Sequence, residues 1–426
     1  MKIKIPVEQL RVGMHVTDLE RPQFEGAPLF RGLTIRSQTQ IDKLKRHCTH
    51  VYVDVAESTL FPATRRPASG KWPPSKPFTP EHQKQMQFEI LKLGAAPSDG
   101  GSGYQLQTNL EEEINNVSGS YREAKAVIDT TMEDARQGKR INATHVRKVV
   151  MEMVASVHRN PNGLICLAQL KDKNDYTALH SVRTCIFALV LGHHLGLDDD
   201  DLSALGIGVL LQDIGKTMMP SELLRKPERL NDQEFEVVKS HVSWGVQILL
   251  DTDELPELAI DVARYHHERC DGSGYIHGLD KDQIPQFGQI GAIVDCYDAL
   301  TCDRPYATAI SPHDALTRIY EWRHTKYGTV LVEQFIQCMG IYPIGSVVEL
   351  NTGDVGVVVT INRKRRLRPR VKLVLRPDKT PYKPPKSMNL MKYTTHDGLP
   401  IAIERVLEPG AFGIKPIDYL PLTPSD

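Results

Sequence analysis

Histidines and aspartates recur in or directly after apolar, helix-like stretches in the middle of this chain, and this pattern constrains the fold more than any other feature. His180 lies within TALHSVRTCIFALVLG, Asp213 follows ALGIGVLLQ, and Asp295 follows IGAIV. The complete set is His180, Asp213, His241, His266, His267 and Asp295. A buried polar side chain is costly unless a partner satisfies it. Imidazoles and carboxylates that converge on divalent cations would satisfy the whole set together, so the pattern predicts a helical core around a metal centre.

Each of these residues alone also has a purely structural interpretation. A single histidine on an apolar helix is more often a hydrogen-bonded core residue than a ligand, and a buried aspartate can cap a helix or pair with an arginine. The adjacent His266 and His267 would also suit a solvated helix end. We interpret His193 and His194 in that way, because Gly196 and a run of aspartates follow them. For the set as a whole, a shared metal centre is the simpler hypothesis.

The remaining pattern predicts a mainly α protein, with a helical core flanked by a small β-rich N-terminal domain and a small β C-terminal extension. KIKIPV and HVYVDV alternate as half-buried strands do. Strand-like character returns after the helical region in GSVVELNTGDVGVVVTI, where Asn-Thr-Gly-Asp supplies turn residues. One apolar helix face repeats at i, i+3, i+4, i+7, at Val146, Val149, Val150 and Met153. We divide the chain into a β-rich N-terminal domain (1–60), a proline- and glycine-rich linker with a short helix (61–108), a connecting helix (109–144), the helical domain (145–341) and a small β-rich C-terminal domain (342–426).

Composition excludes some classes of function. The formal net charge is -1 at pH 7, so the charge of the whole chain predicts no attraction to nucleic acid or to a membrane surface. The seven cysteines are scattered without a CxxC pair, which favours a reducing compartment. No apolar run approaches the ~20 residues that a membrane-spanning helix needs, and the N-terminus has no signal-peptide core. We therefore expect a cytoplasmic protein.

The one concentrated basic run is RKRRLRPR at 363–370. It could serve a nucleic acid or an acidic partner. Because no aromatic residues are interleaved with the charges, we favour an exposed hairpin or loop between the strand-like GVVVTI and VKLVL. Nucleic acid is therefore not expected among the partners.

Four segments of the helical region resemble the HD-GYP family. HHERCDGSGYIHGL at 266–279 resembles the family signature HHE-x-x-DGxGYP, and LLQDIGK at 210–216 stands where the family has LLHDIGK. The likeness continues through KPERLNDQEFEVVKSHVSWGVQIL at 226–249 and VDCYDALTCDRPYATA at 294–309. It covers roughly residues 150–340. The first 60 residues also resemble the small N-terminal domain of unknown function that is often joined to HD-GYP domains.

This resemblance implies an HD-type, all-helical core that holds two or three metal ions. They are usually iron or manganese, with zinc, magnesium, nickel or cobalt as alternatives. It also implies hydrolysis of cyclic di-GMP, a bacterial second messenger, to pGpG or onward to GMP. A phosphodiester is a stable anion, and two cations can neutralise its oxygens while lowering the pKa of a bridging water. The expected function is therefore that of a metal-dependent phosphodiesterase in signal transduction.

Carried over position by position, the resemblance assigns each candidate ligand to one of two sites. Asp213 would bridge two metals. The first site would be completed by His241, His266 and His267. The second would be completed by His180, Gln212 and Asp295.

The resemblance also names residues that act on the substrate. Lys216 would meet a phosphate oxygen if the helix continues past the Gln-Asp pair, and Asp213 and Lys216 are the expected catalytic residues. Arg304 would contact phosphate or guanine, although an ordinary surface arginine is an equal alternative. Gly274 and Tyr275 belong to the loop that names the family. A structural turn there is at least as good an interpretation as substrate contact, because glycines permit positive φ and close backbone approach.

The chain departs from the family pattern at four positions. Gln212 replaces the histidine of the His-Asp pair, and a neutral amide oxygen is a weaker donor than imidazole towards iron or manganese. We therefore predict one ordinary metal site and one weakened site. Tyr176 stands where three-metal members have a glutamate, so a third metal is not expected. Ile276 replaces the proline of GYP, which we expect to matter little, and Ala307 replaces a basic residue, which would remove a phosphate contact.

Two hypotheses of different class follow. The first is a cyclic di-GMP phosphodiesterase whose activity Gln212 reduces. The second is a weak or inactive HD-GYP protein that binds cyclic di-GMP or, through the GYP loop, a protein partner. A phosphohydrolase for another nucleotide is disfavoured by the GYP-like loop and the RPY segment. The helix at 110–137 could form a homodimer, and packing within the chain explains its pattern equally well.

Overall fold

The computed structural model describes residues 2–7, 10, 14–19, 33–35, 38–46, 48–54, 89, 106–170, 176–224, 226, 228–303, 308–363, 365–393 and 398–422. The chain forms two compact units, residues 1–70 with 275–278 and residues 71–274 with 279–426. Each unit is described by itself. The predicted linker at 61–108 lies outside the described residues, apart from Glu89 and residues 106–108.

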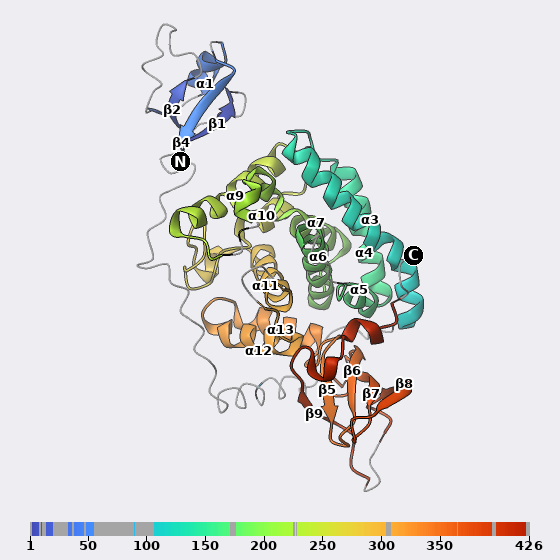
Figure 1. Cartoon of the computed structure of the whole chain (residues 1–426). Coiled ribbons are helices and arrows are strands. Elements are labelled where there is room, and N and C mark those ends of the chain that lie inside the picture. The colour runs from blue at the N-terminus through green and yellow to red at the C-terminus, as the bar shows by residue number, and fades with distance from the viewer. Residues whose placement is uncertain are drawn as a thin grey trace. The chain divides into compact units, whose positions relative to one another are not determined.

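In its described residues, the N-terminal unit forms a small antiparallel sheet and the helix α1 (Gln38–Lys45) (Figure 1). Its strands lie in the order β1-β4-β2-β3, with β1 at Lys2–Pro6, β2 at His15–Leu19, β3 at Leu33–Thr34 and β4 at His50–Asp54. The two strands predicted from KIKIPV and HVYVDV are confirmed, and they pair directly, with Ile3 opposite Val53. The β-rich prediction omitted α1 (Gln38–Lys45), which buries Ile41 and Leu44 at the i, i+3 spacing of a helix face.

The larger unit begins with two helices, α3 (Leu110–Arg136) and α4 (Ala143–Arg159). Asn109 starts α3 by accepting a hydrogen bond from the Glu112 amide at 2.9 Å, where the sequence predicts the helix to begin. The predicted apolar face of α4 is fully buried at Val146, Val149, Val150 and Met153. The apolar face of α3 is also buried within the chain, at Ile114, Val117 and Ile128. This face of α3 therefore packs on its own chain.

Helix α6 is in contact with six other helices of the described chain. The bounds of the remaining helices are α5 (Pro161–Leu167), α6 (Tyr176–Leu195), α7 (Asp199–Leu211), α8 (Ser221–Leu224), α9 (Asp232–Leu250), α10 (Glu257–Tyr265), α11 (Gln286–Thr301), α12 (Pro312–Glu321) and α13 (Thr329–Met339), with the short 3-10 helices η3 (Ile214–Met218), η4 (Lys281–Gln283) and η5 (Trp322–His324). Because α3, α4, α5, α7, α11 and α13 all contact α6, most of this helix is buried. The predicted mainly helical core is confirmed, and its last helix ends at Met339, inside the helical domain expected at 145–341.

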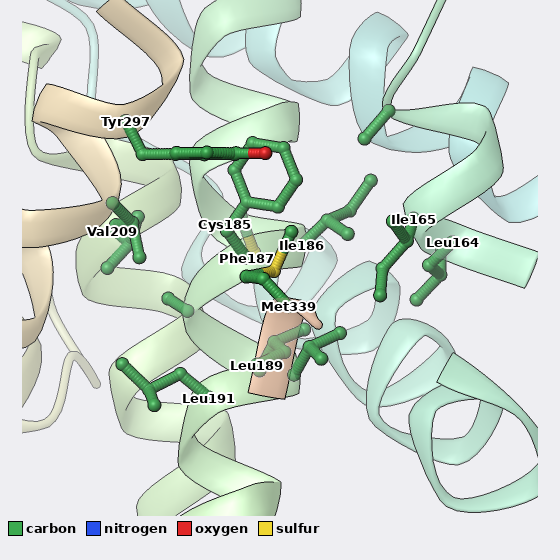
Figure 2. Close-up of a cluster of buried hydrophobic side chains, with 14 of the residues drawn as sticks. Leu164, Ile165, Cys185, Ile186, Phe187, Leu189, Leu191, Val209, Tyr297 and Met339 are labelled. Atoms are coloured by element: carbon green, nitrogen blue, oxygen red, sulfur yellow. The ribbon is translucent and has the colours of Figure 1, made fainter. Parts of the chain in front are cut away.

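Figure 2 shows the centre of this core, where side chains of α6 meet those of its neighbours. Ile186, Phe187 and Leu189 of α6 lie in one cluster with Val209 of α7 and Tyr297 of α11. The rings of Phe187 and Tyr297 meet edge to face, with centroids 5.1 Å apart. Among the described residues, no helix combines the length and the apolar character needed to cross a membrane.

The C-terminal part is a five-stranded antiparallel sheet in the order β8-β7-β6-β5-β9. Its strands are β5 (Val347–Leu350), β6 (Val355–Thr360), β7 (Arg370–Leu375), β8 (Pro381–Asn389) and β9 (Ile403–Val406), followed by η6 (Ala411–Gly413) and η7 (Pro416–Tyr419). The Asn-Thr-Gly-Asp turn joins β5 to β6 as predicted, with Gly353 at φ 83°. One face of the sheet, including Val348 and Leu373, joins the helical core, and the other, including Val347, packs on Ile414. The sheet and the helices therefore share one core, and the domain boundary at 341/342 stays a prediction.

The basic run at 363–370 connects β6 to β7, as the favoured interpretation predicts. Its charges are not uniformly exposed, because Arg366 is only 6% exposed. Burial lowers the pKa of this arginine, and Arg363 nearby lowers it further. At least one of the arginines is thus part of the packing between the sheet and the helices.

Candidate metal centre

Five helices of the larger unit bring the predicted ligands together (Figure 1). His180 lies on α6, Gln212 and Asp213 follow α7, His241 lies on α9, His266 and His267 follow α10, and Asp295 lies on α11. Four of these side chains are almost inaccessible, with exposed fractions of 2% for His180, 1% for Asp213, 1% for His241 and 0% for His266. At this depth every polar atom needs a partner inside the centre.

Asp213 lies in the middle of the ligand set. Its Oδ1 is 3.4 Å from Nε2 of His241 and 3.7 Å from Nε2 of His266, and its Oδ2 is 3.5 Å from Nε2 of His180. Two groups of ligand atoms, each within 4.8 Å of one another, share this aspartate: Asp213 with His241, His266 and His267, and Asp213 with His180 and Asp295. One carboxylate thus faces two adjacent sites. The geometry matches the expected division, and the role of these residues as ligands stays a prediction.

Backbone carbonyls hold two of the imidazoles with Nε2 turned inward. Nδ1 of His241 donates to the Val238 carbonyl at 2.6 Å, and Nδ1 of His266 donates to the Ala263 carbonyl at 3.0 Å. Because a carbonyl oxygen only accepts, Nδ1 carries the proton and the Nε2 lone pair is left for a cation. The two Nε2 atoms face each other at 3.5 Å. Two inward lone pairs beside a carboxylate fit a divalent cation.

Burial and charge keep the ligands in the form that binds cations. Burial lowers the pKa of His241 to about 3. Burial, together with His266 and His241, lowers the pKa of His267 well below its ordinary value. Burial alone would raise the pKa of Asp213, but Lys216 and the neighbouring histidines outweigh it and hold this pKa well below the usual aspartate range. At neutral pH the centre therefore offers the neutral imidazoles of His241 and His267 beside the ionised carboxylate of Asp213.

A glycine contact brings Asp213 to α9. A Cβ on Gly215 would lie 1.9 Å from the carbonyl oxygen of His241 and 2.4 Å from the amide nitrogen of Gly245. No side chain fits there, so η3 packs backbone to backbone against α9. This close approach explains the glycine of the DIGK segment and places Asp213 beside His241.

Gln212 has a buried side-chain amide without a hydrogen-bond partner among the described residues. Its side chain is fully buried, and neither its Oε1 nor its Nε2 has a hydrogen-bond partner among the described residues. Its Oε1 lies 3.5 Å from the position that a Cβ on Gly291 of α11 would take, and the same Cβ would lie 3.3 Å from Cβ of His266. Leaving a buried amide unpaired costs about 1–3 kcal/mol. An unsatisfied oxygen beside the ligand set is consistent with a cation site that Gln212 helps to form.

Lys216 is not placed as the helical interpretation expected. α7 ends at Leu211 and η3 follows, so the helix does not continue past Gln212. Lys216 lies one 3-10 turn after Asp213, and its Nζ donates to Asp213 Oδ2 at 2.5 Å. The side chain of Lys216 is 25% exposed and that of Asp213 is 1% exposed. Lys216 thus lies between the buried centre and the surface.

Sequence reasoning missed the residues that hold His180. Nδ1 of His180 donates to Oδ2 of Asp298 at 2.7 Å, and Arg183 donates to both oxygens of Asp298, at 2.6 and 2.9 Å. Burial alone would raise the pKa of Asp298, but Arg183 and His180 outweigh it and hold this pKa below the usual aspartate range. The missed signal was spacing, because Arg183 follows His180 by three residues and Asp298 follows Asp295 by three, within apolar stretches.

The loop after the two histidines is closely packed. Glu268 is buried, and its Oε2 accepts from the Leu279 amide at 3.0 Å. Gly272 has φ 72°, and a Cβ on Gly274 would lie 2.5 Å from the Cα of Glu268. These contacts support the structural-turn interpretation of Gly274, while substrate contact by this residue stays a prediction.

The positions of four other residues named in the sequence analysis are not described relative to this centre: Tyr275, Arg304, Ala307 and Tyr176. Tyr275 belongs to the other compact unit, so its proposed substrate contact stays a prediction. Arg304 and Ala307 lie outside the described residues, as does the side chain of Tyr176.

The interpretation of His193 and His194 as a solvated helix end is wrong. Both side chains are half-buried. Nε2 of His194 lies 3.0 Å from Oε1 of Gln334 on α13, and burial lowers the pKa of His194 to about 4. The end of α6 packs against α13, which the flanking glycine and aspartates did not reveal.

Three family models match successive parts of the chain. Residues 2–146 match a domain of unknown function (DUF3391), residues 151–331 match an HD domain, and residues 347–409 match a KOW domain associated with HD domain. The matched HD domain carries every residue of the candidate centre.

Individual relatives point in the same direction. A cyclic di-GMP phosphodiesterase of Pseudomonas aeruginosa is 34% identical over 373 residues, which cover 87% of this chain and 84% of that protein. A 3'3'-cGAMP-specific phosphodiesterase of Vibrio cholerae is 30% identical over 259 residues, covering 58% of this chain and 56% of that protein. A cyclic di-GMP phosphodiesterase of Thermotoga maritima is 32% identical over 162 residues, which cover 38% of this chain and 44% of that protein.

Among solved structures, an HDG"Y"P protein of Bdellovibrio bacteriovorus is 14% identical and covers 79% of this chain and 98% of its own, with a TM-score of 0.44, a likeness too low to support a conclusion. The match to the Pseudomonas aeruginosa protein extends over most of both chains, and the HD domain match spans the helices of the candidate centre. This chain therefore belongs to the HD-GYP family, with a DUF3391 domain before its HD domain and a KOW domain after it.

Proposed function

We propose that this chain is a metal-dependent phosphodiesterase that hydrolyses cyclic di-GMP to pGpG and/or GMP, with an activity that Gln212 reduces. The observation that carries the proposal is the position of Asp213, whose Oδ1 faces His241 and His266 while its Oδ2 faces His180. A carboxylate with one oxygen toward each of two ligand groups suits a pair of divalent cations. The relatives named as cyclic di-GMP phosphodiesterases support the substrate.

The ligand set fits two cations that are held unequally. The stronger site would use Asp213, His241, His266 and His267, and the weaker one His180, Gln212, Asp213 and Asp295. Mixed nitrogen and oxygen donors favour iron or manganese, with zinc, magnesium, nickel and cobalt as alternatives. When bound, the cations supply charge neutralisation for the phosphodiester and a means of activating water near neutral pH. The second site is the weaker because an amide oxygen is a poorer donor than imidazole.

Residues of the chain would hold and orient the substrate. Lys216 keeps Asp213 ionised and, being 25% exposed, can present its charge to an incoming phosphate oxygen. The burial of His241 and His266 keeps bulk water away from the ligands, which strengthens the attraction between the centre and an anion. Arg304, Gly274 and Tyr275 remain the other proposed substrate contacts.

The replacement of the expected histidine by Gln212 favours one alternative. If this residue fails as a ligand, the chain would be a weak or inactive HD-GYP protein that binds cyclic di-GMP, or a protein partner through its GYP loop. In the same way, the Vibrio cholerae relative named as 3'3'-cGAMP-specific makes 3'3'-cGAMP the second substrate to test.

The test is a comparison of three proteins purified without oxygen: the wild type, Gln212→His and Asp213→Ala. Bound metals are counted, and hydrolysis of cyclic di-GMP and of 3'3'-cGAMP is measured. Wild-type turnover of cyclic di-GMP that disappears in Asp213→Ala supports the proposal. Binding without turnover in the wild type, with turnover restored in Gln212→His, supports the binding module instead. Faster hydrolysis of 3'3'-cGAMP would change the substrate and keep the reaction class.

Assembly and location belong to the same proposal. We place the protein in the cytoplasm, as the sequence predicts. A homodimer through α3 would have to use its exposed polar face, because the apolar face is buried within the chain. Light scattering of the purified protein, with and without cyclic di-GMP, tests this assembly.

A further inference from the structure

We propose that Asp298 and Arg183 are positioning residues for the cation site that contains His180, and that they fix both the tautomer and the direction of its imidazole. The inference rests on the proposed function only in taking the centre to bind divalent cations. Neither residue belongs to the two proposed ligand groups. Each acts through His180.

The contacts form a chain that leads away from the site. Nδ1 of His180 donates to Asp298 Oδ2 at 2.7 Å, while Nε2 of the same ring lies 3.1 Å from Asp295 Oδ1 and 3.5 Å from Asp213 Oδ2. Arg183 Nε donates to Asp298 Oδ1 at 2.6 Å and its Nη2 donates to Oδ2 at 2.9 Å. A carboxylate held by a two-point guanidinium contact cannot turn, so its remaining acceptor direction is set for His180.

The helix pair explains why these residues lie in register. His180 and Arg183 are three residues apart on α6, and Asp295 and Asp298 are three residues apart on α11, so each pair lies on one helix face. Three contacts join these pairs, and the one between His180 and Asp298 links the other two. Of those two, the contact between His180 and Asp295 lies in the site, and the contact between Arg183 and Asp298 lies behind it.

His180 differs from the other two buried imidazoles in what orients it. His241 and His266 each donate to a carbonyl of their own helix, whereas His180 donates to a carboxylate from another helix. A carboxylate partner makes an imidazole a stronger donor to a cation and locks the ring. His180 belongs to the proposed site that Gln212 weakens. Asp298 therefore strengthens a ligand of the site that has the weaker donors.

Asp298→Asn tests the inference directly. Both oxygens of Asp298 accept from Arg183, so the amide group of an asparagine must turn its NH₂ toward a donor in either orientation. Full-length protein is stripped of metal and titrated with Mn²⁺, in the wild-type and Gln212→His backgrounds so that both sites can be measured. We expect the weaker site to lose about 10–100-fold in affinity and the stronger site to be unchanged.

Two further variants separate positioning from stability. Asp298→Asn leaves the buried Arg183 charge without an anion, which destabilises the fold by itself. The double variant Arg183→Gln/Asp298→Asn removes that charge, so it should regain stability without regaining the weaker Mn²⁺ site. Tyr121→Phe is the matched control, because Tyr121 lies near Arg183 and Asp298 and its buried hydroxyl has no hydrogen-bond partner among the described residues. Its Mn²⁺ affinities should equal those of the wild type.

A second readout follows the ring itself. Nitrogen NMR of His180 should show a protonated Nδ1 in the wild type and in Tyr121→Phe, and a changed tautomer balance in Asp298→Asn and in the double variant. A folded double variant that binds Mn²⁺ at both sites as tightly as the wild type, or that keeps the wild-type tautomer, would overturn the inference. Mn²⁺ binding without phosphodiester hydrolysis would count against the proposed function alone.

Discussion

Gly215 and His241 are in direct backbone contact, since a Cβ on Gly215 would lie 1.9 Å from the carbonyl oxygen of His241. The same contact brings Asp213, two residues before Gly215, to within 3.4 Å of Nε2 of His241. Packing of η3 on α9 and assembly of the ligand set therefore depend on the same few atoms.

Gly215→Ala should disturb both the fold and the centre. The added methyl group has no space, so we expect the free energy of unfolding to fall by about 1–3 kcal/mol. The displaced Asp213 should also lower Mn²⁺ affinity at the stronger site. Urea denaturation and Mn²⁺ titration measure the two effects. Gly119→Ala on α3 is the control, since no atom lies within 4 Å of its Cβ position. This variant should raise the free energy of unfolding, by at most about 1 kcal/mol.

Gln212→Met should stabilise the metal-free protein. The variant replaces a buried amide that has no partner by an apolar side chain of similar length, so we expect a gain of about 1–3 kcal/mol in the free energy of unfolding. The gain should shrink when Mn²⁺ is added, because a ligand oxygen is lost. Gln334→Met provides the contrast, because the Gln334 amide has a partner in His194 and its loss should destabilise. Equal effects of the two variants would contradict the special status of Gln212.

The stability of the metal-free protein should depend on pH in the mildly acidic range. Burial lowers the pKa of His241 to about 3 and that of His194 to about 4, from an ordinary value of 6.5. At a pH between the lowered pKa of each histidine and 6.5, the unfolded chain binds a proton at that histidine and the folded chain does not. The free energy of unfolding should therefore fall as pH falls below about 6.5, by up to about 1.4 kcal/mol per pH unit for each histidine.

Urea denaturation at about pH 7 and about pH 5 measures this slope. His194→Asn should flatten it, because one of the two depressed pKa values is removed. An unchanged slope in that variant would show that His194 titrates normally in the folded protein.

Leu373→Ala should destabilise the HD domain although the residue lies in the C-terminal sheet. Leu373 is 1% exposed and belongs to the core that the sheet shares with the helices. We expect the free energy of unfolding to fall by about 2–5 kcal/mol. Unfolding, measured by circular dichroism at the helical wavelength, should remain a single transition. Leu399→Ala, at a position that is 61% exposed, should change the stability by less than about 0.5 kcal/mol. Separate transitions for sheet and helices would contradict the shared core.

Local pattern predicted much of the fold because local spacing determines local structure. The apolar face from Val146 to Met153, the start of α3 at Asn109 and the turn at Gly353 all depend on residues within a few positions of one another. The same reasoning failed for α1, which is short and lies between strands, and for His194, whose surroundings come from a distant helix.

For the candidate centre, the sequence by itself determined which side chains carry ligand chemistry and that Gln212 breaks the His-Asp pair. Only the tertiary structure decided the distances at which Asp213 faces its two groups, that Lys216 lies on a 3-10 turn beside it, and that Arg183 and Asp298 hold His180. His180 and Asp298 are 118 positions apart in the chain. Contacts over such a separation are set by how α6 and α11 pack, which the periodicity of either helix alone does not contain.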